Sequence, residues 1–116
     1  MSPIASYTEV IKTKETTPLL LDLGAGKCRA CKMMEPVLEE LKKNYQGIMR
    51  VKFIDVWKNR AEAGKYKILL IPTQIFFSPD GKELFRNQGF YSKDQILNKW
   101  KELGYNLQRN EQGTAK

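Results

Sequence analysis

Residues 19–31 read LLLDLGAGKCRAC: an apolar run with one carboxylate inside it, a glycine-rich turn, and then the chain's only two cysteines. The apolar run is typical of a strand that is covered on both faces. Gly24 and Gly26 loosen the backbone before Cys28. Two cysteines separated by two residues at the start of a helix have both sulfurs on one side of its first turn, close enough for a disulfide. The stretch therefore predicts a buried strand that leads into a reversible dithiol–disulfide pair.

The residues after the cysteine pair predict a long helix. Apolar side chains recur there at spacings of three and four, between mostly charged positions, and they are Met33, Met34, Val37, Leu38, Leu41 and Tyr45. At the helix start, unpaired backbone N–H groups and the positive end of the helix dipole favour a thiolate. Lys27, Arg29 and Lys32 add positive charge there. We predict that Cys28 is the exposed nucleophile and that Cys31 is the more buried resolving thiol.

Other interpretations of the cysteine pair stay open. A structural zinc site usually takes four Cys or His ligands, and this chain has no histidine and no third cysteine. A dimer that shares both pairs would complete such a site, so a metal-bridged dimer is one alternative. The pair could also be inert packing, for example in a non-catalytic module that binds partners in an apolar groove around Ile71, Pro72 and Phe90.

Length and charge bound the domain organisation and the partners. A chain of 116 residues fits one domain with a sizeable core, which we place at residues 1–104, followed by a polar, flexible tail at 105–116. The formal net charge is +7, but the lysines are spread over all predicted helices and turns beside acidic residues. We therefore expect no nucleic-acid partner and steering toward anionic protein surfaces. We also expect a monomer.

The sequence also bears on the cellular compartment in which the protein works. Its longest apolar runs, such as Ile68-Leu69-Leu70-Ile71, fall far short of the ~20 residues that a membrane-spanning helix needs. No basic segment followed by an apolar one opens the chain as written. We expect a cytoplasmic protein, with the extracytoplasmic side of a membrane as the alternative if a leader was removed.

The remaining chain predicts alternating helices and strands. The expected elements are a helix that starts at the capping box Ser6-Tyr7-Thr8-Glu9, a strand at 19–23, a helix from Cys28 to about Asn44, a buried strand at 50–56, a short helix from Asn59 to Tyr66, a hairpin of 73–77 and 82–87, and a helix from Ser92 to Gly104. Asn59 with Glu62, and Ser92 with Gln95, have the spacing of a capping box. Trp57, Trp100 and the methionines after Cys31 are expected in the core.

This order of elements, with Cys-x-x-Cys at the start of the long helix, resembles the thioredoxin family over almost the whole chain. Asp22, six residues before Cys28, is similar to the buried strand aspartate of that family. Pro36 falls where the family kinks its helix, and Ile71-Pro72-Thr73 looks like its cis-proline loop. Gly89 looks like the glycine at the far rim of its substrate groove. The resemblance implies a thioredoxin-like α/β fold, a central mixed sheet flanked by helices, with the cysteine pair at the N-terminus of the long second helix.

The resemblance also implies an activity: a thiol–disulfide oxidoreductase that reduces or exchanges disulfides in partner proteins without a cofactor of its own. Cys28 would attack the substrate and Cys31 would resolve the mixed disulfide. Asp22 would accept the proton of Cys31, since a carboxylate in an apolar strand is costly unless it is used; a satisfied structural carboxylate is the alternative. The substrate would bind near Ile71, Pro72, Thr73, Gly89 and Arg29. The electron donor would be a flavoprotein thioredoxin reductase or a membrane-embedded thiol carrier.

Four positions in three segments depart from the family's pattern. Thioredoxins usually have Trp immediately before the first cysteine, where this chain has Lys27, and Gly-Pro between the cysteines, where it has Arg29-Ala30. The lysine often found on the central strand is replaced by Phe53. A basic residue beside Cys28 favours the reduced form, so we expect a potential somewhat less reducing than that of thioredoxin.

Overall fold

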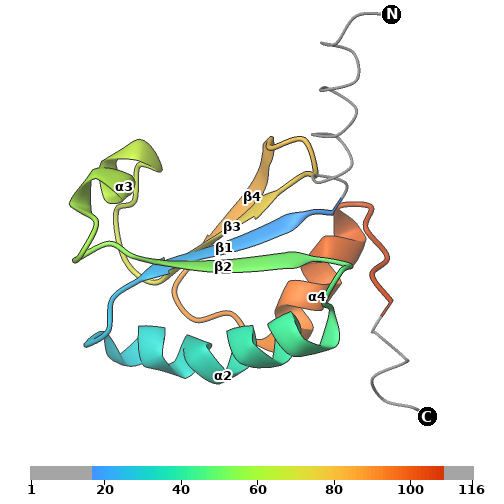
Figure 1. The fold of residues 1–116 in the computed structure, drawn as a ribbon, viewed down its shortest axis with the longest axis horizontal. Coiled ribbons are helices and arrows are strands. Elements are labelled where there is room, and N and C mark those ends of the chain that lie inside the picture. Colours follow the sequence, from blue (N-terminus) through green and yellow to red (C-terminus); the bar gives the residue numbers. More distant parts are fainter. Residues whose placement is uncertain (1–16, 109–116) are drawn as a thin grey trace, which may run out of the picture.

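The computed structural model describes residues 17–108. In chain order its elements are β1 (Leu19–Gly24), α2 (Arg29–Asn44), β2 (Arg50–Asp55), α3 (Arg60–Lys65), β3 (Thr73–Phe77), β4 (Glu83–Gln88) and α4 (Lys93–Glu102). Their order is the one expected from the sequence (Figure 1). The helix predicted from Ser6 lies outside the described residues, as do residues 109–116 of the predicted tail.

Within residues 17–108, four strands form one mixed sheet in the order β2-β1-β3-β4. Strand β1 runs parallel to β2 and antiparallel to β3, and β3 pairs with β4 as an antiparallel hairpin. Leu23 lies opposite Thr73, and Thr73 lies opposite Gln88. The end of β1, the start of β3 and the end of β4 therefore meet at one end of the sheet. The predicted mixed sheet is confirmed, and its topology brings the cysteine loop and the Pro72 loop to the same end.

Helices α2 and α4 cover one face of the sheet (Figure 1). The buried cluster on this face consists of Leu20, Met34, Leu38, Leu41, Tyr45, Met49, Val51, Phe76, Ile96 and Trp100. The rings of Phe76 and Trp100 lie 4.8 Å apart between centroids, a distance at which aromatic pairs add to the free energy of burial. This packing fixes α2 along the sheet and thereby places its N-terminus beside the end of β1.

A smaller cluster covers the other face. It consists of Leu21, Leu23, Val56 and Ile75, with Ala63 and Tyr66 from the α3 segment packed against it. Side chains alternate between the two clusters along β1: Leu20 faces α2, whereas Leu21 and Leu23 face the α3 side. Strand β1 is thus covered on both faces, as its apolar run predicts.

Strand β2 is not the buried strand that the sequence predicts. It is an edge strand of the described sheet, and Val51 is its one buried residue. Lys52 and Phe53 are exposed. Val51 packs in the cluster on the α2 side, whereas Ile54 and Val56 pack in the cluster on the α3 side. Residues 50–56 thus contact both clusters, but only Val51 and Val56 are buried.

Three local predictions are also wrong. Met33 is 51% exposed and Trp57 is 53% exposed, although both were expected in the core. Met33 and Met34 are consecutive on a helix, so they point about 100° apart and Met34 alone faces the sheet. Asn59 forms no side-chain cap for α3; its side-chain amide donates instead to the Asp55 carbonyl at 3.1 Å.

The last helix begins and ends as predicted. Ser92 and Gln95 form a complete capping box, and Gly104 follows the helix with a φ of +99°, a conformation that glycine adopts without steric cost. Packing continues beyond residue 104, because Tyr105 and Leu107 are partly buried against the core. No helix within residues 17–108 is long and apolar enough to cross a membrane.

Candidate active site

Cys28 is the N-cap of α2, as the sequence predicts. Its backbone is extended, with φ −82° and ψ 125°, and its sulfur accepts a hydrogen bond from the backbone N–H of Cys31 at 3.2 Å. The first turn of α2 holds no acidic residue. A sulfur in this position receives one of the N–H groups that a helix leaves unpaired, at the positive end of its dipole. The half-exposed Cys28 is therefore placed to carry negative charge while staying accessible.

Cys31 lies one turn further along α2 and is 3% exposed. Its sulfur accepts a hydrogen bond from the backbone N–H of Ala25 at 3.4 Å. Burial above all, then the hydrogen bond and charge of Cys28 and the charge of Asp22, raise the pKa of Cys31 to about 12, against a lowering by the Ala25 hydrogen bond. Cys31 is thus a neutral thiol at neutral pH. The two free cysteines occupy different environments although they belong to one helical turn.

Asp22 is fully buried in the middle of β1. One carboxylate oxygen, Oδ1, accepts a hydrogen bond from the Gln74 side chain at 3.1 Å, whereas Oδ2 has no partner among residues 17–108. Burial raises the pKa of Asp22 from 3.8 to about 6, against a smaller lowering by the Gln74 hydrogen bond. The carboxyl group therefore changes charge close to neutral pH, which suits a group that accepts and releases protons.

The polar residues that support Asp22 were missed by sequence reasoning. Gln74 donates to Asp22, and its own side-chain carbonyl accepts from Asn87 at 2.9 Å. These residues come from β3 and β4, so one chain of hydrogen bonds crosses three strands. The available signal was Gln74 itself, a large amide inside the otherwise apolar strand TQIFF.

The predicted proline loop lies at the same end of the sheet. The Ile71–Pro72 peptide bond is cis, and Thr73 is buried with its hydroxyl donating to the Leu70 carbonyl at 2.7 Å. The N–H of Gly89 donates to the Pro72 carbonyl at 2.7 Å, and Gly89 has a φ of +101°. The structure thus brings Pro72 and Gly89 into direct contact, although 16 residues lie between them in the sequence. Arg29, the first residue of α2, is exposed beside Cys28.

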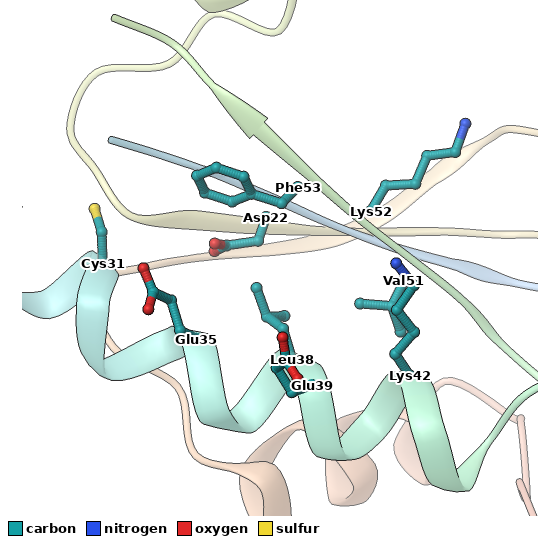
Figure 2. A pocket seen from close by; sticks show the side chains of 9 residues that line it. All are labelled: Asp22, Cys31, Glu35, Leu38, Glu39, Lys42, Val51, Lys52 and Phe53. Atoms are coloured by element: carbon teal, nitrogen blue, oxygen red, sulfur yellow. The ribbon is translucent and has the colours of Figure 1, made fainter. Parts of the chain in front are cut away.

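A cavity of about 250 Å³ lies between α2 and β2 and extends from Cys31 along the helix (Figure 2). Its walls are formed by Asp22, Cys31, Glu35, Leu38, Glu39, Lys42, Val51, Lys52 and Phe53. The cavity therefore joins the buried thiol and the buried carboxylate in one space. Phe53 lies opposite Asp22 in the β1–β2 pairing. An aromatic ring therefore occupies the position where the family resemblance led us to expect a lysine.

A protein-family model, Thioredoxin, matches the chain over residues 3–102. The chain belongs to the thioredoxin family. Curated relatives include thioredoxin from Staphylococcus aureus, which is 40% identical over 77 residues, or 66% of this chain and 73% of that protein. Membership of this family together with an intact Cys-x-x-Cys pair makes the chain a thiol–disulfide oxidoreductase.

Solved thioredoxin structures share the fold. The germline-specific thioredoxin Deadhead from Drosophila melanogaster is 26% identical with a TM-score of 0.69, over 86% of this chain and 93% of that one. Chloroplastic thioredoxin z is 26% identical with a TM-score of 0.69, over 89% of this chain and 90% of that one. Thioredoxin-2, a component of the protein secretion machinery of the malaria parasite, is 28% identical with a TM-score of 0.67, over 74% and 82%. The predicted family and fold are thereby confirmed.

Proposed function

We propose that the chain reduces disulfide bonds in partner proteins through the Cys28–Cys31 couple, with Asp22 as the proton acceptor. The observation that carries the proposal is the contrast within one helical turn. The sulfur of Cys28 caps α2 and is half-exposed, whereas Cys31 is buried in the same cavity as Asp22. The Cys28 sulfur is accessible to a substrate, whereas the Cys31 sulfur is accessible only from inside the cavity.

The reaction begins at Cys28. Its thiolate attacks one sulfur of the substrate disulfide, the substrate S–S bond breaks, and the departing sulfur takes a proton from solvent. A mixed disulfide between Cys28 and the substrate remains. Cys31 then attacks the Cys28 sulfur, a Cys28–Cys31 disulfide forms, and the second substrate sulfur leaves as a thiolate. Two electrons pass from the dithiol to the substrate.

The resolving step needs a proton acceptor because Cys31 begins as a thiol. Two of the influences that raise its pKa, the hydrogen bond and the charge of Cys28, depend on the Cys28 thiolate. Formation of the mixed disulfide removes that charge, so the pKa of Cys31 falls at the moment when it must react. Asp22, with a pKa of about 6, is mostly ionised at neutral pH and accepts the proton.

The substrate site of this proposal is the rim around Cys28. An extended segment of the substrate pairs with the backbone of Ile71 as an added strand, beside Pro72, Thr73 and Gly89. The hydrogen bond from Gly89 to the Pro72 carbonyl supports a preformed rim. Lys27 and Arg29 are exposed next to Cys28, which favours substrates with acidic side chains near their disulfide.

The electron donor in this proposal is a thioredoxin reductase acting on a monomer in the cytoplasm. A membrane-embedded thiol carrier is the alternative donor. The two differ in one testable respect: a flavoprotein reductase with its nicotinamide reductant would reduce the purified Cys28–Cys31 disulfide in solution, without membranes.

The reduction potential of the pair tests the proposed direction of reaction. The protein is equilibrated in graded thiol buffers, trapped with an alkylating agent and weighed. We expect one two-electron transition, somewhat less reducing than the roughly −270 mV typical of thioredoxin. A transition near roughly −120 mV would identify a disulfide donor instead. Cysteines that react with the alkylating agent only after a chelator is added would identify a metal-bridged dimer.

A further inference from the structure

Asp22 cannot exchange protons with solvent directly, since its side chain is fully buried. With a pKa of about 6, Asp22 nevertheless releases at neutral pH the proton that, in the proposed function, it accepts from Cys31. Its Oδ1 atom is engaged by Gln74. Oδ2 has no hydrogen-bond partner among residues 17–108. The proton must therefore leave through Oδ2 and the cavity that Asp22 lines.

The walls of this cavity restrict the route. Leu38, Val51 and Phe53 are apolar and neither accept nor donate protons. Besides Asp22, the titratable groups in the lining are Cys31, Glu35, Glu39 and Lys42 from α2, and Lys52 from β2. Figure 2 shows the Glu35 side chain rising from α2 toward the sheet, with its carboxylate between the side chains of Cys31 and Asp22. In the same view Glu39 and Lys42 lie further along α2, and the Lys52 side chain points away from Asp22.

We propose that Glu35 carries protons between Asp22 and solvent through the cavity behind Cys31. Glu35 lies four residues after Cys31, so both side chains occupy the same side of α2. Its carboxylate lines the cavity although the residue as a whole is exposed. A cavity of about 250 Å³ with carboxylates on two sides has room for bridging water, whose share of liquid volume is about 30 Å³ per molecule. Because it acts through Asp22, Glu35 is a positioning residue and not a catalytic one.

The proton balance is simple and involves no oxidant or reductant. When the Cys31 sulfur attacks, its proton moves to Asp22. Protonated Asp22 passes the proton through water in the cavity to the Glu35 carboxylate, which releases it to bulk solvent. In the reverse direction, when the Cys28–Cys31 disulfide is reduced, the same path returns a proton to Cys31.

The chain itself explains why a carboxylate is needed at this place. Phe53 lies opposite Asp22 on the neighbouring strand and offers no charge or hydrogen-bonding group. A Cβ on Gly24 would lie 3.4 Å from the Phe53 ring and 2.9 Å from the Cys31 sulfur, so the ring also closes the space beside the thiol. With this wall apolar, Glu35 is the titratable side chain in the lining that faces both Asp22 and water.

The inference rests on the proposed function, and its test separates the two. At about pH 5, below the Asp22 pKa of about 6, most Asp22 carboxyl groups hold a proton that they must lose before they can accept the Cys31 proton. The full-length protein is reduced and, at this pH, mixed rapidly with a disulfide-containing protein, and acid-quenched samples are weighed to follow the mixed disulfide. We expect Glu35→Gln to form the mixed disulfide at the wild-type rate but to resolve it about tenfold more slowly, below the range for loss of a direct acid–base group. Glu39→Gln, in the same wall but further from Asp22, is the matched control and should resolve at the wild-type rate.

Chemical rescue distinguishes proton transfer from a structural effect. Formate is small enough for the cavity and carries protons as a carboxylic acid does. It should restore resolution in Glu35→Gln, in proportion to its concentration, and should leave Glu39→Gln unchanged. Wild-type resolution in Glu35→Gln, or slow resolution that formate does not restore, would overturn the inference while leaving the proposed function intact. A wild-type protein that forms no mixed disulfide would instead overturn the proposed function.

Discussion

Cys28 and Cys31, at the start of α2, carry the same thiol group in contrasting surroundings. On the rim, Cys28 is half-exposed and its sulfur receives a backbone N–H, with exposed basic residues beside it. In the cavity, Cys31 is buried and shares the lining with Asp22. In the proposed mechanism, burial and charge, not residue type, therefore assign the two sulfurs their roles. The rim is suited to attack on a substrate, and the cavity is suited to resolution.

The largest expected effect comes from removing each sulfur in turn. Cys28→Ser removes the nucleophile on the rim, so reduction of a protein disulfide should stop and no mixed disulfide should form. Cys31→Ser leaves the rim intact, so attack should proceed and the substrate should stay bound to Cys28. Mass spectrometry of the two variants after incubation with a disulfide-containing protein checks both outcomes. A stable adduct on Cys28→Ser through Cys31 would reverse the assignment.

The next effect concerns the cavity alone. Asp22→Asn keeps an oxygen for the Gln74 hydrogen bond but cannot accept a proton. We expect resolution of the mixed disulfide to slow by at least about 100-fold, the usual lower range for a general base. The first attack should keep its rate, because Cys28 lies outside the cavity lining. Rapid quenching with mass analysis measures both steps, and equal slowing of attack and resolution would contradict the separation of rim and cavity.

Asp22 should also lower the stability of the folded protein at neutral pH. Its pKa is about 6 in the fold against 3.8 as the ordinary value, so the folded state binds this proton more tightly than the unfolded state. Below about pH 4 both states hold a neutral acid and no penalty arises. Between the two pKa values the penalty develops, and above about pH 6 it is complete, at about 3 kcal/mol.

Asp22→Asn should therefore be more stable than wild type at pH 7, by up to about 3 kcal/mol, and equally stable near pH 3.5. Urea unfolding of the reduced proteins at several pH values measures the difference. An advantage of the variant that is the same at all pH values would show that packing, and not the buried charge, is responsible.

A smaller effect should follow from crowding the cavity end of β1. A Cβ at Gly24 would lie 2.9 Å from the Cys31 sulfur and 3.2 Å from its Cβ, whereas a Cβ at Gly26 meets only Asp55 Oδ2, at 4.0 Å. Gly24→Ala should displace Cys31, slow resolution and destabilise the fold by about 1–3 kcal/mol. Gly26→Ala is the matched control and should change neither. Comparable losses in both variants would mean that the loop's flexibility matters more than the space beside Cys31.

Sequence patterns predicted many residues of the candidate site, because these residues differ in type from their neighbours in the sequence. The cysteines, Asp22 within an apolar strand and the Ile71-Pro72-Thr73 turn each stand out from their neighbours. Patterns did not predict that β2 is an edge strand, since an apolar run records burial but not the order of strands in a sheet. The Gln74–Asn87 support and the position of Glu35 in the cavity depend on contacts across the fold, and no local spacing encodes them.

The most direct test of the contrast between rim and cavity is the order in which the cysteines react. The reduced protein is treated with limiting iodoacetamide at neutral pH, and the modified residue is located by peptide mass spectrometry. The account predicts that Cys28 is alkylated first and that Cys31 reacts only when the protein is unfolded. Alkylation of Cys31 before Cys28 would contradict it.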